Sequence, residues 1–191
     1  MNTPNTLTVQ QALSTFFEKN NLGEDGGLNK SWAWLKMGRF YIPFPNPASR
    51  KKALMFHDIH HIVTGYESNW RGEVAISAWE VSGGCGEYGA AWVLDLWGFS
   101  LGLLVFQQRT FRAFIRGQRT RNLYHHTFTH EQVLGMKIEE VQTALKLNQP
   151  NDQLATAKEI LAFMQWAIIA AVFGFITFVA PYVLLIWWWM R

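Results

Sequence analysis

The sequence predicts an all-α protein, a helical bundle followed by one C-terminal transmembrane helix. No segment sustains the alternation of apolar and polar residues that a half-buried strand shows, whereas several segments repeat apolar residues at helical spacing. Clusters of glycine and proline separate these segments. The stretch 160–190 contains no charged residue. A length of 191 residues allows one domain with an appendage.

Residues 1–47 are expected to form a short helix and an extended, proline-rich arm. Residues 8–19 place Leu13, Phe16 and Phe17 at the spacing of one helix face. Three prolines then restrict the residues before them to extended backbone; they are Pro43, Pro45 and Pro47.

Residues 48–150 are expected to form the main helical domain. Glycine and proline clusters divide it into helices at 49–64, 69–81, 88–119 and 131–147. Gly65 follows the first of these helices directly and is a natural C-terminal cap.

Residues 151–191 are expected to form a linker and a membrane anchor. The 21 residues of 166–186 have almost no polar side chain, and about 20 apolar residues span a bilayer. Three tryptophans and Arg191 close the segment, and Pro181 is expected to kink it. The alternative is a buried core helix. Because 16 of the 17 Lys and Arg precede residue 160, we expect a single-pass protein with its body on the cytoplasmic face, in a bacterial inner membrane.

The stretch "HDIHHIVTGYESNWRGE", residues 57–73, concentrates potential metal ligands. At 100° per residue, His57, Asp58 and His61 share one helix face. The chain reverses after Gly65, so Glu73 on the first turn of the next helix can face back toward them. Two imidazoles and two carboxylates from an antiparallel pair of helices predict a divalent metal site. Burying two carboxylates without a cation would be costly.

The spacing of these residues resembles that of a known protein family. The pattern His-Asp-x-x-His, eleven residues, then Glu, resembles the signature of the coenzyme Q biosynthesis protein 4 family. The surrounding "MFHDIHHIVTGYESNWRGEVAISAWE" and the later "AFIRGQRTRNLYHHTFTHEQVLGMKIEEVQTALKLN" are similar to that family as well, so the resemblance covers roughly residues 48–148. Family members usually stop near the equivalent of Leu147, and this chain departs from them by its anchor.

The resemblance implies an all-helical fold with a lipid pocket, a bound zinc or similar ion and a role in ubiquinone synthesis. The expected partners are a prenylated aromatic lipid, the membrane and other quinone-biosynthesis proteins, and self-association is left open. The expected reaction is oxidative decarboxylation, in which the ring carboxylate of a polyprenyl-hydroxybenzoate is replaced by a hydroxyl. No catalytic residue is identified beyond the metal ligands. Zinc has no redox chemistry, so iron or manganese would suit an oxidative reaction better.

Two other functions are weighed against this enzyme. One is a non-catalytic scaffold that binds prenylated intermediates for partner enzymes. The other is a membrane di-iron hydroxylase, which the pattern His-x-x-His-His at 57–61 and the histidines at 125, 126 and 130 suggest. Such enzymes use about eight histidines and several spans, whereas this chain has six His and one clear span.

Residues 88–106 are apolar except for Asp95. They could form a second span, but we favour a core helix that lines the lipid pocket, in which Asp95 needs a polar partner.

Residues 84–89 match G-x-G-x-x-G but follow a helix instead of a strand, which excludes dinucleotide binding. Four arginines form a stripe on one helix, namely Arg109, Arg112, Arg116 and Arg119. A solvated face is the alternative, but beside the predicted membrane anchor we expect the stripe to contact anionic headgroups; no nucleic-acid module is recognisable.

Overall fold

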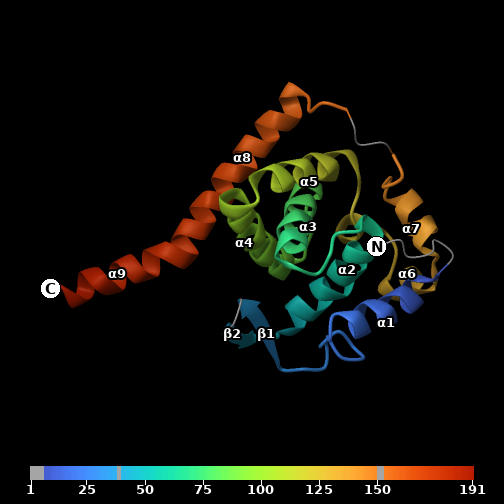
Figure 1. The fold of residues 1–191 in the computed structure, drawn as a ribbon, viewed down its shortest axis with the longest axis horizontal. Coiled ribbons are helices and arrows are strands. Elements are labelled where there is room, and N and C mark those ends of the chain that lie inside the picture. The colour runs from blue at the N-terminus through green and yellow to red at the C-terminus, as the bar shows by residue number, and fades with distance from the viewer. Residues whose placement is uncertain (1–6, 38–39, 150–152) are drawn as a thin grey trace.

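The computed structural model describes residues 7–37, 40–149 and 153–191 and confirms the all-α class with one long apolar C-terminal helix (Figure 1). Its elements are α1 (Val9–Lys19), β1 (Trp32–Met37), β2 (Phe40–Pro45), α2 (Ala48–Thr64), α3 (Trp70–Gly83), α4 (Gly89–Val105), α5 (Gln107–Arg119), the 3-10 turn η1 (Leu123–His125), α6 (His130–Gly135), α7 (Ile138–Ala144), α8 (Ala157–Gly174), the π-helical turn η2 (Phe175–Val179) and α9 (Ala180–Trp189).

Local signals define the helices that carry the site. The side chain of Asn69 accepts a hydrogen bond from the Gly72 N–H and so caps α3. Gly65 ends α2 in the left-handed conformation, with φ 76°, which favours glycine. The chain therefore turns sharply between α2 and α3, as the sequence predicts.

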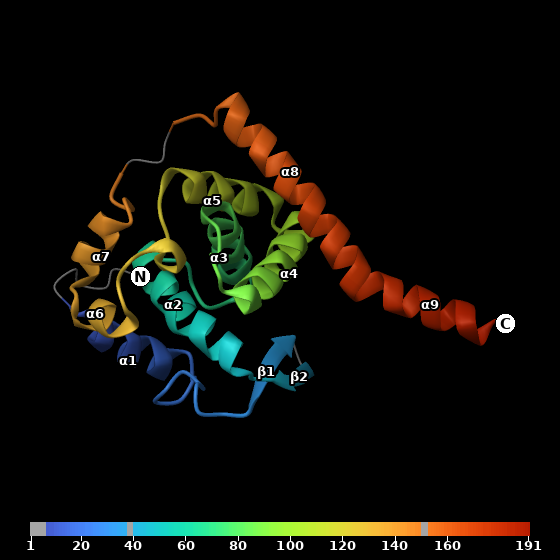
Figure 2. The same cartoon turned by 180° about the vertical axis from the view of Figure 1, so that it is seen from behind.

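The core lies around α3, which packs between α4 and α5 (Figures 1 and 2). Large side chains from all three helices are fully buried there, namely Trp79, Phe99 and Phe114. Small residues let the helices approach closely, since a Cβ at Gly117 would lie 2.5 Å from the Trp79 carbonyl oxygen. Gly98 lies beside Ser77 and Gly102 beside Val74, so α3 and α4 run antiparallel.

The sequence did not predict the β-hairpin. The stretch β1 pairs with β2 in antiparallel register, with Trp32 opposite Pro45 and Trp34 opposite Pro43. The prolines do give an extended chain, as expected. Both strands of a two-stranded sheet are edges, where proline is tolerated, and the pairing is too short for a sustained pattern.

Two predicted helices are each divided in two. The predicted helix 88–119 breaks at Phe106, whose φ of −132° and ψ of 45° are not helical, although neither glycine nor proline marks the break. The predicted helix 131–147 ends once at Gly135 and restarts after Lys137 with a capping box from Glu140. Gly135 is a common helix-ending residue and could have predicted this break. The apolar residues at helical spacing on both sides of it favoured one continuous helix instead.

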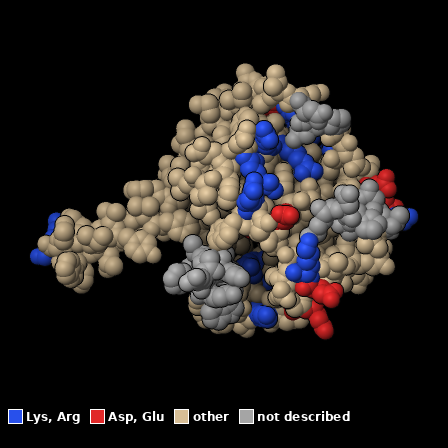
Figure 3. All heavy atoms as spheres, in the orientation of Figure 1, with Lys and Arg blue, Asp and Glu red and all other residues tan. Residues whose placement is uncertain are grey.

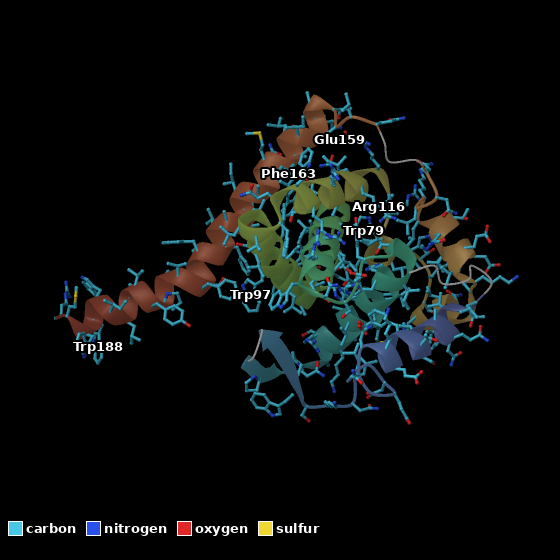
Figure 4. All side chains as sticks on the ribbon, viewed as in Figure 1. Trp79, Trp97, Arg116, Glu159, Phe163 and Trp188 are labelled. Carbon is cyan, nitrogen blue, oxygen red and sulfur yellow. The ribbon has the colours of Figure 1, made fainter. Side chains whose placement is uncertain are left out.

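The predicted membrane anchor is less separate from the body than a linker and tail would be. The helix α8 packs on α4 and α5 along its length. Phe163 lies among Phe99, Phe111 and Phe114 (Figure 4), and Gly174 at the end of α8 approaches Ser100 of α4. The contact continues into η2, where Thr177 accepts a hydrogen bond from the Trp97 indole N–H at 3.0 Å and Phe178 packs on the Trp97 ring. The helix then leaves the body as α9, and Trp188 lies near its free end (Figure 4).

The helical stretch α8–α9 is long and apolar enough to cross a membrane. It spans 33 residues and contains an 18-residue window of mean hydropathy 2.4. Its length is about 50 Å at about 1.5 Å per residue, against a bilayer core of about 30 Å. Pro181 lies just after the π-helical turn η2. Proline has no N–H to donate within the helix, which accounts for an irregular turn before it.

Candidate metal centre

Three of the four predicted ligands converge between α2 and α3. Nε2 of His57 and Nε2 of His61 are 3.2 Å apart. The Glu73 carboxylate faces both rings, with one oxygen 3.5 Å from Nε2 of His57 and the other 3.4 Å from Nε2 of His61. The turn at Gly65 brings α3 back beside α2 and produces this convergence.

The spacing of the three donor groups suits a small divalent cation. Zinc binds histidine nitrogen and carboxylate oxygen at about 2.0–2.1 Å, and tetrahedral ligands at that distance are about 3.3–3.4 Å from one another. The observed separations of 3.2, 3.4 and 3.5 Å match this value. Two imidazoles with one carboxylate also suit non-haem iron. The residues present therefore fit a metal of either kind.

In both histidines, Nδ1, on the far side of the ring from the other ligands, contacts an oxygen acceptor. His61 Nδ1 lies 2.9 Å from the Tyr66 carbonyl oxygen, to which it donates as N–H. His57 Nδ1 lies 3.0 Å from Oε2 of Glu80. A cation that displaces the proton from Nε2 would leave the proton on Nδ1 of each ring, as metal-binding histidines require. His61 also stacks on Phe16 of α1.

Glu80 is the functional residue that the sequence reasoning missed. Its side chain is fully buried and contacts Nδ1 of His57 and Nδ1 of His60. Nε2 of His60 accepts the Leu123 N–H at 2.9 Å, so His60 donates from Nδ1 to the carboxylate. A signal was present, because Glu80 follows Glu73 by seven residues and so lies on the same face of α3 two turns later.

Opposing effects set the protonation of this cluster. Burial acts to lower the pKa of His57, but the Glu80 and Glu73 carboxylates raise it well above its ordinary value. Burial lowers the pKa of His60 and keeps that ring neutral. Burial acts to raise the pKa of Glu80, but His57 and His60 lower it overall, so Glu80 stays charged.

Asp95 is buried in α4 and has polar neighbours, as predicted from the sequence. The Cys85 thiol donates to Oδ2 of Asp95 at 3.4 Å. Burial and the neighbouring Glu80 carboxylate raise the pKa of Asp95 well above its ordinary value. His57, Glu80 and Asp95 form a second group with ligand atoms within 4.8 Å of one another. A protonated Asp95 is a poor cation ligand, however, so the first group is the better candidate for a metal site.

Asp58, the fourth predicted ligand, belongs to neither of the two groups. Its carboxylate is buried and faces the loop before β1, since a Cβ at Gly26 would lie 3.3 Å from its Oδ2. Burial raises its pKa to about 6. A role for Asp58 as a ligand remains a prediction.

The candidate centre is closed on one side and open on the other. The His61 side chain is only 1% exposed, whereas that of Glu73 is 40% exposed. The Ser68 hydroxyl donates to Oε1 of Glu73 at 3.3 Å and orients this outer ligand. A structural zinc site is usually closed by four protein ligands, whereas a catalytic one keeps a position for water or substrate. Three converging ligands beside an open edge correspond to the second arrangement.

The remaining histidines lie elsewhere. His125, His126 and His130 lie in η1, after it and at the start of α6, and none of them joins either of the ligand groups among the described residues. His125 and His126 instead line a surface hollow with Arg121. That hollow does not adjoin the metal centre, so the lipid pocket remains a prediction.

Compared with family models, with curated proteins and with solved structures, the chain matches none, so any assignment of function depends on the arrangement of its own residues.

Proposed function

We propose that this protein is a membrane-anchored, metal-dependent enzyme of ubiquinone biosynthesis. Its substrate is a prenylated hydroxybenzoate, and its reaction replaces the ring carboxylate with a hydroxyl. The observation that carries the proposal is the open three-ligand centre of His57, His61 and Glu73. The ligand spacing of the resembling family and the apolar α8–α9 helix support the same assignment.

The residues of the chain have separate tasks in this proposal. His57, His61 and Glu73 hold the cation, and Glu80 fixes the orientation and tautomer of His57. A bound divalent metal supplies a Lewis acid that attracts an anionic carboxylate or phenolate. The exposed edge at Glu73 leaves access for the aromatic head of the substrate.

The reaction needs an oxidant, because exchanging a carboxylate for a hydroxyl removes two electrons from the substrate. We assign this role to dioxygen with an external two-electron donor. The carbon–carbon bond to the carboxylate breaks and carbon dioxide leaves. One oxygen atom enters the ring as hydroxyl, and the other leaves as water after uptake of electrons and protons. Because zinc has no redox chemistry, iron or manganese is the metal we expect in the active protein.

The test is lipid mass spectrometry of a deletion strain that carries wild type, Glu73→Ala or Glu87→Ala. Glu87 is exposed and lies outside both ligand groups, so it serves as the matched control. If the protein is this enzyme, cells that carry Glu73→Ala should accumulate a prenylated aromatic that still bears its carboxylate. Full quinone synthesis by a Glu73→Ala protein that has lost its metal would favour the alternative, a non-catalytic lipid-binding scaffold.

A further inference from the structure

The corner between α4 and α5 exposes large apolar side chains. Leu104 is 77% exposed and Val105 is 59% exposed. Trp70, at the start of α3, is 38% exposed. The two segments touch, because the Arg71 guanidinium lies over the Phe106 ring at 6.0 Å. We call Trp70, Leu104 and Val105 the apolar corner.

Arginines surround the apolar corner. Arg71 and Arg112 are exposed, and Arg109 Nε donates to the Arg71 carbonyl at 2.8 Å. The other two arginines of the predicted stripe contact other parts of the protein. Arg116 donates to the Thr64 carbonyl, and Arg119 pairs with Glu159 of α8. Of the stripe, only Arg119 is therefore matched by a carboxylate, and the charge nearest the apolar corner is that of Arg71 and Arg109. Figure 3 shows Lys and Arg gathered over α3 and α5.

The apolar corner lies on the side of the body from which the tail departs. Both ribbon views place the junction of α4 and α5 against α8, at the edge where the chain leaves toward α9 (Figures 1 and 2). The corner is also close to the metal centre. Gly102 of α4 lies beside Val74, the residue after Glu73, so the corner and the open edge of the site are about one helical turn apart.

We propose that the apolar corner and its arginines dock on the surface of an anionic lipid bilayer, as a second membrane contact besides α8–α9. Tryptophan and arginine favour the headgroup level, where anionic lipids attract guanidinium groups. Leucine and valine at the corner enter the outer acyl region. The contact fixes the body against the membrane and places the Glu73 edge near the lipid from which a prenylated substrate arrives. That consequence rests on the proposed function, and the docking itself does not.

The test uses the full chain in vesicles of phosphatidylcholine with phosphatidylglycerol. A spin label is placed at Leu104→Cys or, separately, at Val105→Cys. Native Cys85 is fully buried and does not compete for the label. Ser14→Cys on the exposed face of α1 gives the water reference, and Leu184→Cys in α9 gives the bilayer reference. Accessibility to oxygen and to a polar nickel complex is then compared at each site.

We expect the labels at positions 104 and 105 to favour oxygen, as the label in α9 does. If both labels meet the nickel complex as readily as the Ser14→Cys label, the corner faces water and the proposal is overturned. This readout involves neither metal nor substrate, so its result is independent of the proposed enzymatic activity.

The charges are tested on the Leu104→Cys background. One cation near an anionic surface contributes about 1 kcal/mol, so each lost arginine should lower the docked-to-undocked ratio about five-fold. Arg71→Gln with Arg112→Gln should therefore shift the label toward water, and Lys52→Gln with Arg121→Gln, at exposed positions outside the corner, should not. Equal shifts in the two double variants would show a general charge effect and contradict the assigned surface.

Discussion

The Glu80 carboxylate lies 3.0 Å from Nδ1 of His57, on the side of the ring opposite the Nε2 that faces Glu73. This relationship makes His57 the link between an exposed ligand group and a fully buried carboxylate. Metal-binding histidines commonly donate their second N–H to a carboxylate, which fixes the ring and raises its basicity. Glu80 does this for His57 and also binds the neighbouring ring, His60.

Glu80→Gln should weaken metal binding by about 10–100-fold without removing any of the three ligands. The amide keeps the volume but carries no charge, and its nitrogen cannot accept from an imidazole N–H. Competition with a metal-binding dye measures the affinity, and ¹⁵N spectra of the histidines report whether His57 still carries its proton on Nδ1. Glu87→Gln on the surface is the control. Unchanged affinity together with an unchanged tautomer would mean that Glu80 has no positioning role.

The histidines at 57, 60 and 61 should separate into two classes on substitution by alanine. Loss of His57 or His61 should remove most bound metal, as should Glu73→Ala. His60→Ala should keep the metal but destabilise the fold, because it leaves the Leu123 N–H and part of the Glu80 carboxylate unpaired in the core. Each buried unpaired group costs about 1–3 kcal/mol.

Metal analysis by mass spectrometry and thermal unfolding together measure the two effects. If His60→Ala emptied the site as His61→Ala does, the histidine-box interpretation of 57–61 would be restored. If His61→Ala retained the metal, the convergence at Nε2 would not be the binding site.

Asp58→Asn distinguishes the ligand set predicted from the sequence from the one assembled by the structure. Asp58 is buried toward the Gly26 loop and stands outside the group of His57, His61 and Glu73. We therefore expect the isosteric amide to lower metal affinity far less than Glu73→Ala. Titration of both variants with zinc and with iron under anaerobic conditions measures this. A loss as large as that of Glu73→Ala would show that Asp58 turns inward to complete a four-ligand site.

The helices and the ligands were predictable where a local rule determines them. Gly65 can adopt a left-handed cap, and the period of 3.6 residues places His57 and His61 together, so α2, its end and the convergence with Glu73 follow from spacing. The break at Phe106 has no such signature, because it depends on how α4 and α5 pack around α3. The partners of Glu80 were also hidden. Asp95 of α4 lies beside Glu80, and Leu123 of η1 binds His60, the ring that contacts Glu80; only tertiary structure brings these segments together.

The same limit applies to the anchor. An uncharged run of 31 residues, 160–190, indicates a membrane span but not which part of it touches the protein. Phe163 and Trp166 are as apolar as the residues of α9, yet they pack against Phe111 and Trp92 of the body. Composition alone cannot separate a lipid-facing side chain from one that faces another helix.

Two truncations separate the part of the C-terminal helix that packs on the body from the part that extends beyond it. Removal of 175–191 should release the protein from the bilayer core and leave the body folded, because α8 still covers α4 and α5 and only the Trp97 contacts with Thr177 and Phe178 are lost. Removal of 153–191 should instead expose the ring cluster around Phe99 and Phe114, which Phe163 contacts at centroid distances of 5.9 and 5.4 Å. It also deletes Glu159, the partner of Arg119. The shorter chain should unfold at lower temperature or aggregate, in proportion to the apolar area uncovered.

Phe163→Ala in the full chain tests the same contact without truncation. Full burial of a phenylalanine corresponds to about 3–5 kcal/mol on replacement by alanine, and for the partly exposed Phe163 we expect about 2 kcal/mol. Phe175→Ala, at an exposed position of η2, should leave stability in detergent unchanged. The measurement is thermal unfolding in detergent followed by the fluorescence of the buried tryptophans. If the two substitutions have equal effects, or if both truncated chains unfold alike, α8 contributes no packing to the body and acts as anchor alone.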